Sequence, residues 1–143
     1  MKLVSKAYDF LTKERCAVLS LLVAKDTVHS AAMLYSYQVD PLELYFFTES
    51  DSRKMAYLGQ KQTLNCSLVV GTTEEKKKTL QMNGEILFVT DESYLKKIKH
   101  VHYARFPKSI PYESPKTVFL KFVPRWYRFT DYTFRPPEIS EED

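Results

Sequence analysis

The stretch LYFFTESDSRKMAYL, residues 44–58, combines the two patterns on which the fold depends. It begins with an apolar and aromatic run, which predicts a β-strand over Glu43–Thr48. After a polar turn it continues as SRKMAYL, which predicts a short helix over Ser52–Lys61 that crosses to the next strand. Hydroxyl groups and two adjacent cations therefore lie where a strand ends and a helix begins.

This junction is suited to binding a phosphate monoester, which carries close to two negative charges at neutral pH. Arg53 can bind two phosphate oxygens at once, and Lys54 supplies a point charge. The hydroxyls of Thr48 and Ser52 can donate further hydrogen bonds, beside the positive end of the helix dipole. The chain has no glycine-rich loop, which excludes Walker and Rossmann phosphate sites. A pair of solvated surface cations explains Arg53 and Lys54 equally well.

Apolar runs on both sides of this stretch predict more strands, joined mostly by short turns. The expected strands cover residues 17–24, 28–37, 43–48, 63–71, 79–90, 117–123 and 126–130. Helices are expected over residues 3–14 and over Ser93–Arg105, the second capped by Asp91. Gly84, in the middle of a strand, predicts a bulge or a barrel corner. We therefore predict a mainly β (α+β) fold, a six- to seven-stranded antiparallel split β-barrel with flanking helices.

The length of 143 residues fits a single domain over residues 1–135, followed by an acidic, frayed tail over residues 136–143. A net charge of +3 is too small to indicate DNA binding by composition. Cys16 and Cys66 lack CxxC spacing, and we expect buried free thiols in a reducing compartment. The apolar run Cys16–Ala24 is too short to cross a bilayer. These features predict a cytoplasmic protein.

Residues with the usual catalytic chemistry are sparse. His100 and His102 would point about 200° apart on a helix, so they cannot bind one metal ion together. The chain has no GxSxG motif, and neither cysteine lies in an evident cationic turn. A metal site and a hydrolase are therefore not predicted, and no catalytic residue is assigned.

Several short motifs occur in an order that points to a known family. They are VHSAA (28–32), LYFFT (44–48), SRK (52–54), LQMNGE (80–85), DE (91–92), YARFP (103–107) and FTD (129–131). From about Leu11 to Asp131, the chain resembles the FMN-binding split-barrel family that includes pyridoxamine 5′-phosphate oxidase. The last two motifs look especially like a small bacterial subgroup of that family.

The resemblance implies a homodimer that binds FMN at the subunit interface. In the family pattern, the flavin phosphate would be held by Thr48, Ser52, Arg53 and Lys54. The flavin ring would be bordered by Ala31, Ala32 and Met33, with Gln81 at its polar edge and Trp126 from the partner chain. A tryptophan in the core is an equal alternative for Trp126.

The chain departs from the oxidase itself at both of that enzyme's other cationic motifs. The segment AMLYSY, residues 32–37, has no cation, and residues 129–135 lack the arginine and histidine pattern that binds the substrate phosphate in the oxidase. In addition, Thr79 replaces a glutamine that contacts the flavin. The resemblance therefore implies a flavin site more directly than it implies oxidation of pyridoxamine phosphate.

Three functions remain open from the sequence. The first is a flavin-dependent oxidoreductase, in which the cofactor supplies the redox chemistry. The second is a non-catalytic binder or sensor of FMN, haem or another planar ligand. The third is a nucleic-acid-binding barrel, because rings alternate with cations over Lys121–Phe129 as they do in stacking platforms. The substrate is not predicted.

Overall fold

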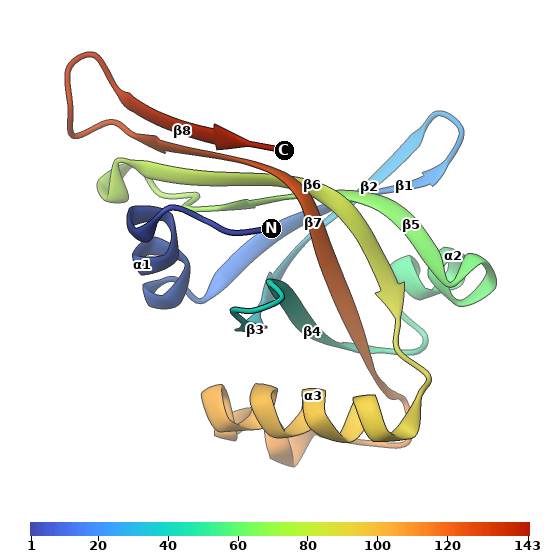
Figure 1. Cartoon of the computed structure of the whole chain (residues 1–143). Coiled ribbons are helices and arrows are strands. Elements are labelled where there is room, and N and C mark those ends of the chain that lie inside the picture. Colours follow the sequence, from blue (N-terminus) through green and yellow to red (C-terminus); the bar gives the residue numbers. More distant parts are fainter.

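Figure 1 shows a strongly curled antiparallel sheet with helices around it. The computed structural model describes all residues, Met1–Asp143. Along the chain the elements are α1 (Ser5–Lys13), β1 (Cys16–Ala24), β2 (Thr27–Leu34), β3 (Ser36–Gln38), β4 (Glu43–Glu49), α2 (Arg53–Lys61), β5 (Thr63–Val70), β6 (Lys78–Phe88), α3 (Glu92–Arg105), β7 (Thr117–Asp131) and β8 (Glu138–Glu142). Short 3-10 helices, η1 and η2, cover Glu74–Lys76 and Pro107–Tyr112.

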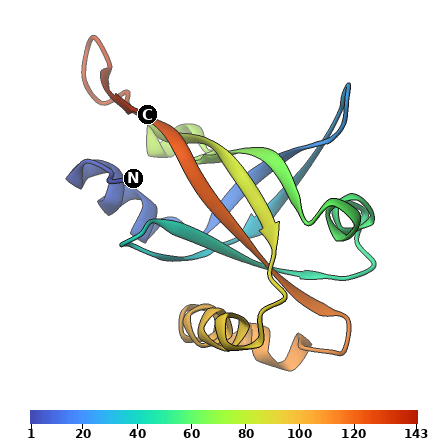
Figure 2. The same ribbon diagram turned by 45° about the vertical axis from the view of Figure 1, so that its right-hand side comes forward.

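The strands pair in the order β2-β1-β5-β6-β7-β4-β3, and β8 pairs with β7. The sheet curls until β2 approaches β4, yet these two strands share no ladder. Figure 2 shows the resulting half-barrel, with α3 lying across its lower end. The split between β2 and β4 leaves one side of β2 without a strand partner. The predicted split barrel with flanking helices is confirmed, with eight strands in place of six or seven.

Side-chain alternation along β1 explains which face of the sheet is buried. Ala17, Leu19 and Leu21 point inward and are fully buried, while Ser20 and Leu22 point the other way. The inward residues belong to a continuous core that also contains residues from β4, β5, β6 and β7 and from the helices α1 and α2. One apolar face per strand is what an antiparallel half-barrel requires.

Two strand boundaries differ from the sequence-based expectation. The expected strand over residues 28–37 is interrupted at Tyr35, whose buried hydroxyl donates to the Leu11 carbonyl, and the chain then joins β4 as β3. The two expected strands near the C-terminus form the single strand β7. Pro124 is tolerated there because it faces Gly84 at a bulge, where the ladder register shifts.

The bulge predicted at Gly84 is confirmed. A Cβ at this position would lie 2.1 Å from the Val123 carbonyl oxygen, so a side chain has no room.

The C-terminal tail is not frayed, which corrects the prediction. Residues Glu138–Glu142 pair with β7 as β8, and acidic side chains of this strand form ion pairs with cationic residues. Glu141 accepts from Arg128 at 2.8 Å and from the Trp126 indole at 3.0 Å. The negative charge that suggests disorder in isolation is therefore matched by the neighbouring strand.

The α3 helix begins as predicted, because the Asp91 carboxylate accepts a hydrogen bond from the Tyr94 amide at 2.9 Å. Its buried residues are Ile98 and His102, whereas Val101 is only half-buried. Cys66 is buried, but Cys16 is exposed at the start of β1, contrary to the expectation of two buried thiols. None of the helices is both long and apolar enough to cross a membrane.

Candidate functional site

A cavity of about 270 Å³ lies at the split of the barrel, between β2 and the helices α2 and α3. We call it the split cavity. It is lined by Ala31, Ala32, Met33, Leu34, Phe47, Lys54, His102 and Ser109. Three of the residues expected beside the flavin ring and one expected at the phosphate thus line the same cavity.

Lys54 is the only charged residue of the split cavity. It is the second residue of α2, and only 8% of its surface is exposed. Its ammonium group forms no ion pair and no hydrogen bond in the structure. Burial lowers the pKa of Lys54, because a buried charge loses its hydration. Lys54 therefore offers the cavity a cation that no acidic side chain of the chain pairs.

Polar groups that could bind an anion surround the start of α2. The Thr48 hydroxyl lies 3.4 Å from the Ser52 hydroxyl, to which it donates. Ser52 is the N-cap residue, but its side chain does not cap the helix. The first amides of α2 have no partner within the helix, as at any helix N-terminus. The junction is therefore free to donate several hydrogen bonds.

Arg53 occupies the first position of α2, where it is exposed and has no acidic partner. The nearest acid along the chain, Asp51, is paired with Lys116 at 3.0 Å. The structure thus places Thr48, Ser52, Arg53 and Lys54 at one turn beside the split cavity, although Arg53 does not line it.

β2 forms the opposite wall of the split cavity. It is the last strand of the sheet path, so the backbone groups along one side of it lack a ladder partner. The small side chains of Ala31 and Ala32 keep this wall shallow, and Met33 is half-buried. A flat ligand could therefore approach the strand and hydrogen-bond its free backbone edge.

Gln81 and Trp126 do not join this site within one chain. They lie on β6 and β7, on the side of the sheet that faces away from the core, which we call the outer face. Gln81 is exposed, and the half-buried Trp126 donates its indole N–H to Glu141. The alternative of a core tryptophan is therefore wrong, and a contact from a partner chain stays a prediction.

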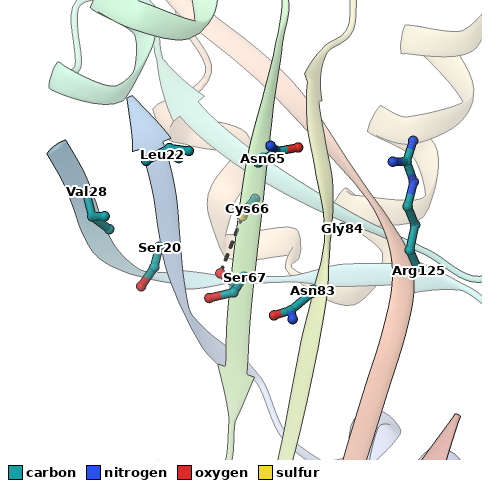
Figure 3. Close-up of a pocket in the computed structure, with 9 residues that line it drawn as sticks. All are labelled: Ser20, Leu22, Val28, Asn65, Cys66, Ser67, Asn83, Gly84 and Arg125. Carbon is teal, nitrogen blue, oxygen red and sulfur yellow. Dashed lines mark hydrogen bonds between the residues drawn. The ribbon is translucent and has the colours of Figure 1, made fainter. Parts of the chain in front are cut away.

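The outer face carries a second hollow, of about 430 Å³, drawn in Figure 3. Its lining residues are Ser20, Leu22, Val28, Asn65, Cys66, Ser67, Asn83, Gly84 and Arg125. Most are small or amide side chains, and Arg125 is paired with Glu85 at 2.8 Å. Leu22 and Val28 are 40% and 63% exposed. This is a shallow surface of short side chains with an apolar end.

His102 is the cavity-lining residue that sequence reasoning missed. It lines the split cavity, and its ring Nδ1 lies 2.8 Å from the buried Ser36 hydroxyl. Burial, followed by the charge of Arg105, lowers the pKa of His102 to about 4. The imidazole is therefore neutral at neutral pH. A usable signal was present, since His102 falls on the apolar side of α3 together with Ile98, four residues earlier.

A family model matches residues 3–131, with the description pyridoxamine 5′-phosphate oxidase. The chain belongs to the pyridoxamine 5′-phosphate oxidase family. Among curated protein sequences, none matches this chain.

Solved structures with the same fold include members and neighbours of the pyridoxamine 5′-phosphate oxidase family. General Stress Protein 26 from Bacillus anthracis is 21% identical, with a TM-score of 0.65 and coverage of 96% of each chain. An FAD-binding protein from Mesorhizobium loti is 16% identical, with a TM-score of 0.69, and 89% of this chain and 94% of that chain are covered. A heme-binding protein from Mycobacterium smegmatis is 8% identical, with a TM-score of 0.75, and 96% of this chain and 56% of that chain are covered. At these identities the likeness shows the fold and leaves the ligand open.

Proposed function

We propose that this protein binds FMN at the split cavity, as a homodimer, and acts as a flavin-dependent oxidoreductase. The observation that carries the proposal is Lys54, a largely buried residue that lines this cavity and whose ammonium has no acidic partner. A buried charge without a counter-ion is costly, and in folded proteins it is normally paired. The phosphate of FMN would supply that counter-ion.

The surroundings of Lys54 favour a phosphate over a simple anion. Arg53 lies next to Lys54 at the start of α2, and neither residue has an acidic partner. The hydroxyls of Thr48 and Ser52 and the free helix amides add neutral donors. Several donors and two cations match the several oxygens and the double charge of a phosphate monoester.

The size of the split cavity favours a site shared between two chains. Ligand pockets usually measure roughly 300–1,000 Å³, so a cavity of about 270 Å³ is small for a whole nucleotide. Ala32 and Leu34 line this cavity and also point toward the outer face beside β1. A second copy seated on the outer face would thus cover the mouth of the cavity. It would also bring its own Gln81 and Trp126 to the interface, in a two-fold arrangement.

Bound FMN would supply the electron transfer, and the chain would bind it, orient it and exclude water. Lys54 and its neighbours at the start of α2 would hold the phosphate. The free backbone edge of β2 would contact the flavin ring. Pyridoxamine phosphate is not proposed as the substrate, because residues 32–37 contain no cation that could add to the phosphate site.

A non-catalytic binder of a planar ligand such as haem is the second candidate. The observation that favours it is the imidazole of His102 at the split cavity, because the tautomer with an unprotonated Nε2 is a common axial ligand of haem iron.

The visible absorption spectrum of the purified protein, followed by titration with FMN and riboflavin, tests the proposal. Flavin bands and a strong preference for FMN over riboflavin are expected. In Lys54→Met this preference should fall by about tenfold to a hundredfold, the value of one charge-assisted contact. Lys61→Met removes the same charge from the far end of α2 and should leave the preference unchanged. Equal binding of both flavins by the parent protein would refute the phosphate site, and a Soret band would favour haem.

A further inference from the structure

The buried side of α3 brings one hydrogen-bonding ring to the split cavity. His102 is 1% exposed, lines this cavity, and has one ring nitrogen, Nε2, without a partner in the chain. We propose that His102 is a ligand-contacting residue whose Nε2–H donates a hydrogen bond to an acceptor atom of the flavin ring. This inference rests on the proposed binding of flavin.

The proton on Nε2 follows from the needs of Ser36. The Ser36 side chain is fully buried, and its only hydrogen-bond partner is His102 Nδ1, at 2.8 Å. A buried hydroxyl proton without an acceptor is costly, so the Ser36 O–H donates and Nδ1 accepts. A neutral imidazole carries one proton, which must then be on Nε2.

Aromatic neighbours hold the ring in place. Phe47 of β4 stacks on it, with centroids 6.1 Å apart and planes inclined by 17°. Phe106 and Phe119 lie 5.2 Å and 5.6 Å from it, from the end of α3 and from β7. An imidazole fixed on one side by Ser36 and packed on its faces cannot turn Nε2 to another partner. It is a pre-oriented donor at an otherwise mostly apolar wall.

Burial, and after it the charge of Arg105, keep this donor neutral. Arg105 lies one turn further along α3, and Lys54 lines the same cavity from α2. Tyr103, from the same helix, is the other titratable ring in contact. No acid faces the imidazole, so it offers one N–H and no charge. Such a donor suits a carbonyl oxygen or an unprotonated ring nitrogen, and the polar edge of a flavin contains both.

A matched pair of variants separates the contact from a structural role. In His102→Gln the amide nitrogen can reach the position of Nε2, whereas in His102→Asn it can reach only that of Nδ1. We expect His102→Asn to bind FMN and riboflavin about threefold to tenfold more weakly than the parent, the value of one neutral hydrogen bond. His102→Gln should bind both within about twofold. The ratio of FMN to riboflavin affinity should stay constant in both variants, unlike in Lys54→Met.

The opposite order, with His102→Gln weak and His102→Asn like the parent, would overturn the proposal, because the Ser36 contact alone would then matter. Parent-like binding by both variants would overturn it too. Where the variants fail to fold, nitrogen NMR of the parent decides: saturation with FMN should shift the Nε2–H resonance, and no shift refutes the contact. A parent protein that binds neither flavin would refute the proposed function itself, and with it the proposed contact between His102 and flavin.

Discussion

The two polar groups of the split cavity, Lys54 and His102, reach it by different routes. Lys54 comes from one continuous segment in which a strand, a turn and a helix start follow within a few residues. His102 comes from a separate helix, and its orienting partner Ser36 is 66 residues away in the chain. The first group was predictable from a local motif, whereas the second depends on how distant elements pack. Four experiments test this contrast, from the largest expected effect to the smallest.

The phosphate site that the local motif predicts is tested most strongly by combining Arg53→Ala with Lys54→Ala. Each lost charge-assisted contact weakens binding by roughly 1.5–3 kcal/mol, so FMN affinity should fall by about a hundredfold or more. Riboflavin affinity should change little. Calorimetric titration measures both. The exposed adjacent pair Lys96→Ala and Lys97→Ala on α3 is the matched control. Unchanged FMN binding in the double variant would remove the phosphate from this site.

His102, which reaches the cavity through the packing of distant elements, predicts a pH dependence of protein stability. The folded-state pKa of His102, about 4, is below its ordinary value of 6.5, so between these pH values the unfolded chain binds a proton that the folded protein does not. The free energy of unfolding should therefore fall as pH decreases from 6.5 to 4, by roughly 3 kcal/mol from this residue.

Urea denaturation at pH 7 and at pH 4.5 measures this effect for the parent and for His102→Gln. The variant should lose less stability than the parent on acidification, because its amide does not titrate. Equal losses would mean that His102 is not held neutral in the fold.

The outer face is a third region, at which the proposed dimer would form. Val28 is 63% exposed on β2, and Val28→Glu should weaken the dimer at least tenfold, since burying an unpaired carboxylate at a two-fold interface is unfavourable. Val39→Glu introduces the same charge at a loop position that is 46% exposed and should leave the dimer intact. Sedimentation velocity over a concentration series distinguishes them. A parent protein that stays monomeric throughout would refute the shared site.

The smallest effect is expected for Ser36→Ala. This change removes the hydroxyl that orients His102 and leaves the Nδ1 of His102 without a hydrogen-bond partner. The loss should cost about 1 kcal/mol of stability. Flavin affinity should decrease a few-fold, because the imidazole can then turn. Chemical denaturation and fluorescence titration provide the two numbers. An unchanged flavin affinity would show that the aromatic neighbours alone hold the ring.

Much of the fold was predictable, because the periodicity of each strand is local. The alternation in β1, the strand before the SRK motif and the Asp91 cap all depend on a few neighbouring residues. The predictions were wrong where a segment far away in the chain determines the local structure. The acidic tail forms β8 because Arg128 and Trp126 on β7 bind Glu141. Tyr35 interrupts its strand because its hydroxyl binds a carbonyl of the first helix.

By itself, the sequence determined the strand and helix pattern, the charge and hydroxyl groups at the start of α2, and the family to which the chain belongs. Only the tertiary structure decided that Lys54 is buried without a counter-ion, that His102 shares its cavity, and that Gln81 and Trp126 lie elsewhere on the outer face. The physical reason is that side-chain direction within an element follows from its local period. Burial and the meeting of elements follow instead from the curl of the whole sheet, which depends on pairings between residues far apart in the chain.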